Sequence, residues 1–156
     1  MVDESKIGFE FPSYTLVVDK TKIAEFAAAV ELKDNTREIK PIYYDENAAK
    51  EDGYRGIPVP LTFMTSFFFL TGGLAEIVKT LDVDLGKLLH GEEEYEYFSQ
   101  IYAGDVITGK MKVMEIYGRG KKNHVGRFVN VAVLETKITN QSGKLVGKVR
   151  STMIER

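Results

Sequence analysis

The chain has no cysteine and only two histidines, His90 and His124. The absence of cysteine excludes disulfide bonds, thiolate metal sites and a cysteine nucleophile. With two histidines far apart in sequence, we expect no metal site, and no motif calls for a cofactor. The acidic segment Met1–Glu10 lacks the apolar stretch of a signal peptide. Together with the missing cysteines, this favours a cytoplasmic protein.

Strong net charge and long apolar runs are missing too. A formal net charge of −2 gives no electrostatic reason to expect nucleic acid or an anionic membrane as partner. The most apolar stretch, Leu61–Leu70, contains threonine and serine and is far shorter than the roughly 20 residues of a membrane span. A short helix that is apolar on nearly all sides is typical of a buried core helix.

The front half of the chain predicts mainly helices within a single domain, residues 1–156. Tyr14–Val18 is rich in β-forming residues and predicts a short strand. Asp19 follows at an N-cap position, ahead of apolar residues with helical spacing: Ile23, Phe26, Ala27 and Val30.

The following segments lead into the apolar helix. Asp45–Lys50 predicts a short helix, and the loop Tyr54–Pro60, with two prolines and a glycine, predicts stiff extended backbone. That loop leads into the apolar helix at about Leu61. A break at Gly72–Gly73 separates it from a second helical stretch, Leu74–Leu81.

The back half predicts strands at Glu93–Phe98, Val106–Tyr117, Arg127–Thr139 and Lys144–Glu155. The two long strands in the middle are joined by a basic hairpin at 118–126, and the turn Asn140–Gly143 precedes the last strand. An early strand, a buried helix and then a run of antiparallel strands indicate the α+β class. A curved antiparallel sheet wrapped around one long central helix is the hot-dog arrangement, which we expect here.

Several segments resemble the MaoC-like (R)-specific hydratases and dehydratases in the order of that family: Lys22–Val30, Tyr43–Phe63, His90–Val113 and Leu134–Ile154. The Gly-Tyr-x-Gly-x-x-x-Pro-x-Thr-Phe run within the second segment is the most specific. The chain is most similar to the N-terminal-domain branch and to the non-catalytic subunit of split (3R)-hydroxyacyl-ACP dehydratases. The resemblance implies a hot-dog fold and an acyl thioester of CoA or ACP as substrate.

Active members of that family carry Asp-x-x-Pro-x-His on a loop, with a second Asp two residues later. The first Asp and the His hold a water and act as general base and acid. Here Pro41 and Asp45 match, which puts Tyr43 at the histidine position and Glu38 at the aspartate position. Asp34 is a rival to Glu38, because this segment is longer than in the family. Tyrosine, with a pKa of about 10, cannot replace imidazole near neutrality, so the resemblance implies a missing dyad.

The resemblance also places the substrate at the start of the central helix. A glycine N–H there polarises the thioester carbonyl in active members, and here the N–H groups of Leu61, Thr62 and Phe63 are expected to be free for that task. Leu61 replaces this glycine and should crowd the approach. The predicted substrate-binding residues are Tyr43, Pro60, Leu61, Thr62 and Phe63.

Other residues admit both a functional and an ordinary structural interpretation. Asp45 and His90 are weak catalytic candidates, and His124 is expected in solvent. Arg119, Lys121, Lys122 and Arg127 can bind the phosphates of CoA or phosphopantetheine or simply form a solvated hairpin. The acidic run Glu92–Glu94 is expected to be a solvated strand start. The helix aromatics, most of them expected in the core, are Phe63, Phe67, Phe68 and Phe69, and Thr65 is expected to cap the helix or meet a ligand.

Three functional hypotheses remain open. The chain is a non-catalytic hydratase/dehydratase subunit paired with a catalytic MaoC-like partner, or an active enzyme that uses other residues, or an acyl-CoA-binding homodimer without chemistry. An active enzyme could be a hydratase using Asp45, Glu38 or His90, or a hot-dog thioesterase. Thioesterases of this fold usually place a carboxylate near the central helix, and Leu61–Gly73 contains none.

Overall fold

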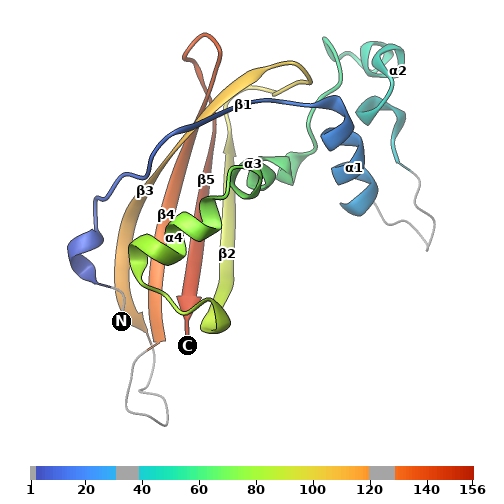
Figure 1. Cartoon of the computed structure of the whole chain (residues 1–156). Coiled ribbons are helices and arrows are strands. Elements are labelled where there is room, and N and C mark those ends of the chain that lie inside the picture. The colour runs from blue at the N-terminus through green and yellow to red at the C-terminus, as the bar shows by residue number, and fades with distance from the viewer. Residues whose placement is uncertain (1–2, 31–38, 120–128) are drawn as a thin grey trace.

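The computed structural model contains one five-stranded sheet with the central helix over one face and the first two helices to its side (Figure 1). The structure describes residues 3–30, 39–119 and 129–156. The strand order is β1–β3–β4–β5–β2, and all neighbours are antiparallel. The strands are β1 (Tyr14–Val17), β2 (Leu88–Tyr97), β3 (Val106–Arg119), β4 (Val129–Asn140) and β5 (Leu145–Glu155). The predicted α+β hot-dog arrangement is confirmed.

Two predicted helices in the front half form where local capping signals placed them. In α1 (Lys20–Val30), the Asp19 carboxylate accepts the N–H groups of Thr21 at 2.7 Å and Lys22 at 3.2 Å. In α2 (Glu46–Glu51), the Asp45 carboxylate accepts from Asn47 and Ala48 in the same way. A carboxylate at this position satisfies helix N–H groups that have no partner within the helix.

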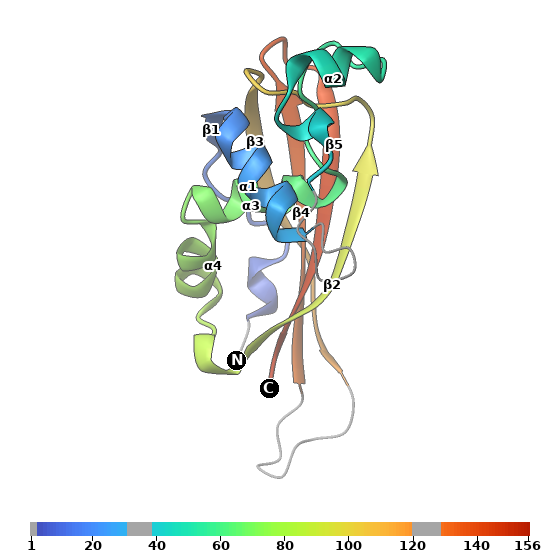
Figure 2. The ribbon, with the colours of Figure 1, turned by 90° about the vertical axis from the view of Figure 1, so that its right-hand side faces the viewer.

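The central helix is divided into two pieces that meet at an angle. A 3-10 turn, η3 (Leu61–Phe63), continues into α3 (Met64–Leu70), and α4 (Gly73–Leu81) follows. The bend between the two parts is 68°, and Gly72 adopts φ 74°, which the missing Cβ permits. The long helix expected from composition therefore bends at the predicted glycine break. Figures 1 and 2 show both pieces over the same face of the sheet.

No single helix in the described part of the chain is long and apolar enough to cross a membrane. The bent pair Leu61–Leu70 and Gly73–Leu81 has sufficient length and apolar composition only when its parts are taken together. Phe63 and Phe67 from the first part, and Ile77 and Leu81 from the second, lie buried in the core of the domain.

The aromatic residues of the central helix differ in burial because the helix presents only one side to the sheet. Phe63 and Phe67 are buried and meet edge-to-face with centroids 5.3 Å apart. Phe68 is half-buried, and Phe69 is 59% exposed. Phe63 and Phe67 are thus core residues, as expected for most of these rings, and Phe69 is an exception.

An ion pair between the exposed Arg55 and the buried Asp105 fixes the loop that leads into the central helix. Arg55 donates to both oxygens of the Asp105 carboxylate, at 2.6 and 2.8 Å, and its guanidinium lies 4.1 Å from the ring centroid of Tyr102. Burial disfavours the ionised Asp105, but hydrogen bonds from Arg55, the Tyr102 N–H and Gln141 hold the pKa of this carboxyl below its ordinary value. The loop is thereby tied to the β2–β3 connection, which positions the start of η3.

Candidate functional site

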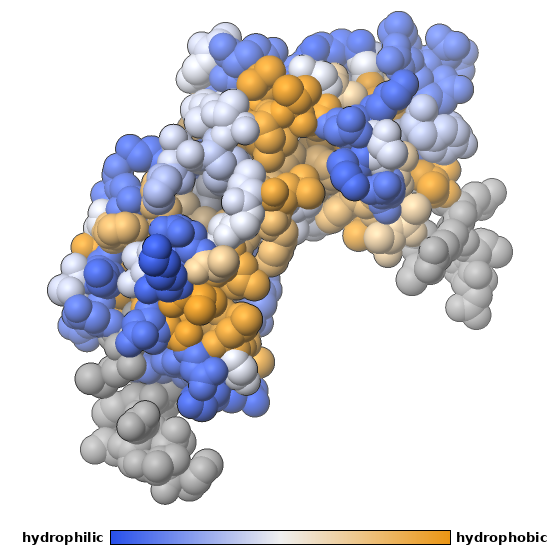
Figure 3. All heavy atoms as spheres, in the orientation of Figure 1, coloured by the Kyte–Doolittle hydropathy of each residue, from blue (hydrophilic) through white to orange (hydrophobic). Residues whose placement is uncertain are grey.

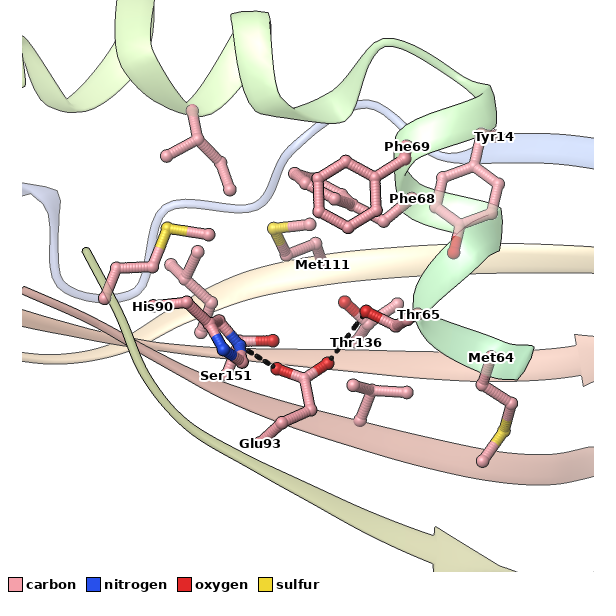
Figure 4. Close-up of a pocket in the computed structure, with 14 residues that line it drawn as sticks. Tyr14, Met64, Thr65, Phe68, Phe69, His90, Glu93, Met111, Thr136 and Ser151 are labelled. Carbon is pink, nitrogen blue, oxygen red and sulfur yellow. Dashed lines mark hydrogen bonds and ion pairs between the residues drawn. The ribbon is translucent and has the colours of Figure 1, made fainter. Parts of the chain in front are cut away.

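A small cavity lies between α3 and the inner face of the sheet (Figure 4). Its volume is about 30 Å³, and residues from α3, α4 and all five strands line it. Most of the lining is apolar and includes Phe68, Met111 and Leu134. Polar side chains from β2, β4, β5 and α3 form the rest of the lining, the polar wall: His90, Glu93, Thr136, Ser151 and Thr65. A concave, mostly apolar site with a few converging polar groups is the usual form of a small-molecule site.

A β-bulge in β2 brings the two titratable groups of this wall together. Residues three apart in a regular strand point to opposite faces. The register of β2 against β5 shifts between His90 and Glu92, so Gly91 is the extra residue. A Cβ at Gly91 would lie 2.8 Å from Cδ1 of Ile154 and 3.1 Å from the carbonyl oxygen of Thr152. The bulge therefore places His90 and Glu93 on the same side, and glycine fits it best.

Glu93 is the centre of a short hydrogen-bonded chain. One carboxylate oxygen lies 2.8 Å from Nε2 of His90, and the other accepts from the Thr65 hydroxyl at 3.2 Å. The Glu93 side chain is 12% exposed, whereas the His90 side chain is 58% exposed. Glu92 and Glu94 are exposed as expected, but the expectation that Glu93 is solvated is wrong, because the bulge turns it inward. Thr65 meets this side chain rather than capping a helix.

Two tyrosines of β2 continue the row beyond Glu93 and hold the start of the central helix. The Tyr97 hydroxyl donates to the Leu61 carbonyl oxygen at 2.8 Å, and the rings of Tyr95 and Tyr97 stack with centroids 6.1 Å apart. Burial, and next the charge of Glu93, raise the pKa of the Tyr95 phenol above its ordinary value. The face of β2 that carries Glu93 and Tyr97 thus contacts both η3 and α3.

The residues at the family's dyad positions lie elsewhere. Tyr43 ends the 3-10 turn η2 (Pro41–Tyr43) and packs, half-buried, on the same apolar cluster as Phe63. The Asp45 carboxylate caps α2, so its two hydrogen bonds already have a structural role. Glu38 and its rival Asp34 fall outside the described residues.

The predicted substrate residues at the start of the helix divide into two groups. Pro60 and Phe63 are buried, whereas Thr62 is exposed and Leu61 is 68% exposed. The Phe63 N–H donates to the Pro60 carbonyl oxygen at 3.0 Å, so the expectation of a free N–H is wrong for this residue. In a 3-10 turn an N–H donates to the carbonyl three residues earlier, so it finds a partner one residue sooner than at the start of an α-helix.

The side chains of the predicted phosphate-binding cluster and of the second histidine lie outside the described part of the chain. Arg119 is the last residue of β3, and its side chain lies outside the described part. Lys121, Lys122, His124 and Arg127 also fall outside the described residues.

Glu93 is the residue that sequence reasoning missed. The signal that could have revealed it is the glycine between His90 and the acidic run, because an isolated glycine in a strand often marks a bulge. Beyond a bulge, the alternation of side chains between the two faces of the sheet is reversed. The residues that follow therefore face the side opposite to the one that a regular strand predicts.

Apolar side chains are also exposed on the face that carries the central helix (Figure 3). Leu61, Phe69 and Leu70 are 68%, 59% and 55% exposed. The long strand β2 lies at one end of the strand order, and within the described residues no strand pairs with its outer edge. Exposed apolar side chains and an unpaired edge strand are typical of an interaction surface.

Comparison with known proteins agrees with this architecture. Residues 5–149 match the family described as FAS1-like, dehydratase domain region. A UPF0336 protein of Saccharopolyspora erythraea is 30% identical over 156 residues, which are 99% of this chain and 92% of the relative. A UPF0336 protein of Thermobifida fusca is 30% identical over 129 residues, 83% of this chain and 76% of that protein.

Solved structures share the fold at lower identity. One is the C-terminally truncated HadBC (3R-hydroxyacyl-ACP dehydratase) complex of Mycobacterium tuberculosis, with a TM-score of 0.71, 22% identity and 96% coverage of both chains. Another is the (R)-hydratase of A. caviae, with a TM-score of 0.67, 18% identity and 94% coverage of both chains. A MaoC-like dehydratase has a TM-score of 0.75 and 24% identity, over 97% of this chain and 42% of the other. This chain therefore belongs to the family of FAS1-like dehydratase domains, with the hot-dog fold of the MaoC-like dehydratases and of the subunits of split dehydratases.

Proposed function

We propose that this protein is the non-catalytic subunit of an acyl-thioester hydratase/dehydratase. It binds part of an acyl-CoA or acyl-ACP substrate and works with a MaoC-like partner that carries an intact Asp/His loop. In this assembly the partner moves the protons, and this chain supplies part of the sheet and part of the acyl site.

The observation that carries the proposal is the replacement of the acid–base histidine by Tyr43. Tyr43 lies on η2 and packs against the core, and Asp45 beside it caps α2. Adding or removing water at a thioester needs titratable groups with pKa values near working pH that hold one water between them. A phenol and a helix-capping carboxylate do not form such a pair, so the chemistry needs a partner.

The surface of the domain supports a partner subunit. Within the described residues no strand pairs with the outer edge of the ten-residue strand β2, which can therefore pair with a second sheet, and the exposed Leu61, Phe69 and Leu70 offer apolar area on the helix face. The HadBC structure is a complex of dehydratase subunits. We infer that this chain pairs in a related manner, with a catalytic subunit or with a second copy of itself.

The test is a hydration assay with trans-2-enoyl-CoA substrates of several lengths. The isolated chain should give no turnover above background, and adding a MaoC-like partner with an intact loop should give activity greater than that of the partner alone. Losing one member of an acid–base pair commonly costs orders of magnitude in rate. Robust turnover by the verified, isolated chain contradicts the proposal.

A second candidate function is favoured by the His90–Glu93 pair. A half-exposed imidazole 2.8 Å from a largely buried carboxylate can act as an oriented general base. The sequence argument against a hot-dog thioesterase, that Leu61–Gly73 contains no carboxylate, also loses force, because Glu93 contacts Thr65 of α3. In this alternative the isolated chain is an active hydratase, and His90→Ala abolishes turnover while His124→Ala does not.

A further inference from the structure

The cavity under α3 has a polar wall that a plain alkyl chain cannot satisfy. Building on the function proposed above, we propose that this cavity receives the far end of the acyl chain and selects chains that carry a hydroxyl there. The substrate class is then an acyl thioester with a terminal hydroxyl rather than an unsubstituted fatty acyl thioester.

The polar wall combines the Glu93 carboxylate with the hydroxyls of Thr65, Thr136 and Ser151 (Figure 4). Each carboxylate oxygen of Glu93 makes one hydrogen bond, one with His90 and one with Thr65. A carboxylate can accept about four hydrogen bonds, so Glu93 can accept more. Thr136 is buried on β4, and Ser151 on the neighbouring β5 pairs with Leu134, two residues before Thr136. Within the described residues, neither of these two hydroxyls makes a hydrogen bond. The wall therefore has both acceptor and donor capacity left for a ligand.

The rest of the lining is apolar and adaptable. Met64, Met111 and Met153 contribute flexible thioether side chains, and Phe68 and Ile77 add further apolar groups. A volume of about 30 Å³ holds one small polar group, such as a hydroxyl on its carbon, and not a whole chain. Unbranched methionines can change rotamer to admit the preceding methylenes. The size of the cavity thus suits the end of a chain.

The energetic argument concerns the desolvation of Glu93. Pressing an alkyl end against a carboxylate removes water without providing a donor, which is unfavourable. A terminal hydroxyl can donate to Glu93 and accept from Thr136 or Ser151, so it replaces the lost water. Hydrogen bonds to a charged group contribute more than neutral ones, and a preference of about tenfold is expected. A terminal carboxylate, in contrast, would repel Glu93.

The experiment is calorimetric titration of the full chain with matched acyl-CoA pairs. Each pair has the same chain length and differs only in a terminal hydroxyl, and a terminal carboxyl analogue is added for comparison. The residues that line the cavity lie in this chain, so the titration uses the isolated chain. In at least one pair the hydroxylated member should bind about tenfold more tightly, and the carboxyl analogue should bind most weakly.

Glu93→Gln should reduce this preference, because it removes the charge and keeps the shape. Glu94→Gln is the matched control: it is the next residue, exposed on the opposite face of β2, and should leave the preference unchanged. Thr136→Val removes a hydroxyl without changing the volume and provides a second test if Glu93→Gln does not fold. Thermal unfolding of each variant establishes that it is folded.

The outcomes separate the two proposals. If acyl-CoA binds but no pair shows a preference, or if the preference survives both Glu93→Gln and Thr136→Val, the inference about the hydroxyl is wrong while the subunit function stands. If turnover with the catalytic partner is absent, the subunit function fails, whichever ligand binds. If no acyl-CoA of either kind binds the folded chain, the cavity is not an acyl site and the inference is overturned.

Discussion

Replacing Gly91 with alanine tests whether the bulge in β2 sets the position of Glu93. The added Cβ would lie 2.8 Å from Cδ1 and 3.1 Å from Cγ1 of Ile154, and 3.1 Å from the carbonyl oxygen of Thr152. The Ile154 Cδ1 can rotate away, but the Thr152 carbonyl belongs to the backbone of β5, whose residue 152 pairs with Glu92. Part of the collision must therefore be relieved by moving one strand against the other.

Overpacking of this kind costs about 1–3 kcal/mol in the free energy of unfolding. For a chain of 156 residues, each kcal/mol lowers Tm by about 2–4 °C. Urea unfolding and thermal unfolding of Gly91→Ala should both show this loss. Gly56→Ala is the control, because no atom lies within 4 Å of the Cβ that it would add and its φ is not in the left-handed region.

The double variant Gly91→Ala/Ile154→Val sharpens the test. Valine lacks Cδ1, the nearest atom to the new Cβ, so the double variant should lose less stability than the sum of the two single variants. If Gly91→Ala is as stable as Gly56→Ala, the bulge tolerates a side chain, and the explanation for the inward turn of Glu93 is wrong.

Other predictions concern the core, the loop and the start of the helix. Phe67→Ala should lower the free energy of unfolding by about 3–5 kcal/mol in urea, since this ring is fully buried. Arg55→Ala should cost on the order of 1 kcal/mol at neutral pH. The pKa of Asp105 is depressed in the fold, so this difference should disappear as the pH falls below about 4; a difference that persists in acid would contradict the ion-pair explanation. Leu61→Gly should modestly improve affinity for a non-reactive acyl-CoA analogue by calorimetry, without adding turnover while Tyr43 remains; unchanged affinity would exclude this helix start from the site. Sedimentation should show an assembly larger than a monomer, and a monodisperse monomer that no partner changes would argue against a shared sheet.

Much of the fold could be predicted because its signals are local. Asp19 and Asp45 cap the helices that follow them, and these bonds span only two or three residues. The break in the central helix follows from Gly72, whose positive φ a residue with a side chain rarely adopts. The turn Asn140–Gly143 likewise closes on itself, since the Asn140 side chain accepts from Ser142 and Lys144. The family could be predicted for a similar reason, because its motifs are contiguous stretches of sequence.

Only the tertiary structure decided which side chains of β2 and α3 face the cavity. A strand's register depends on its partner, and the shift at Gly91 exists only in the pairing of β2 with β5, more than fifty residues later in the chain. That shift puts Glu93 inside, next to His90 and Thr65, where alternation along the sequence suggests only a solvated acidic run. Phe69 is exposed for a related reason: α3 presents only one side to the sheet, and this side is occupied by Met64 and Phe67. Local sequence determined where each element begins and ends, and packing between distant segments determined what the cavity presents to a ligand.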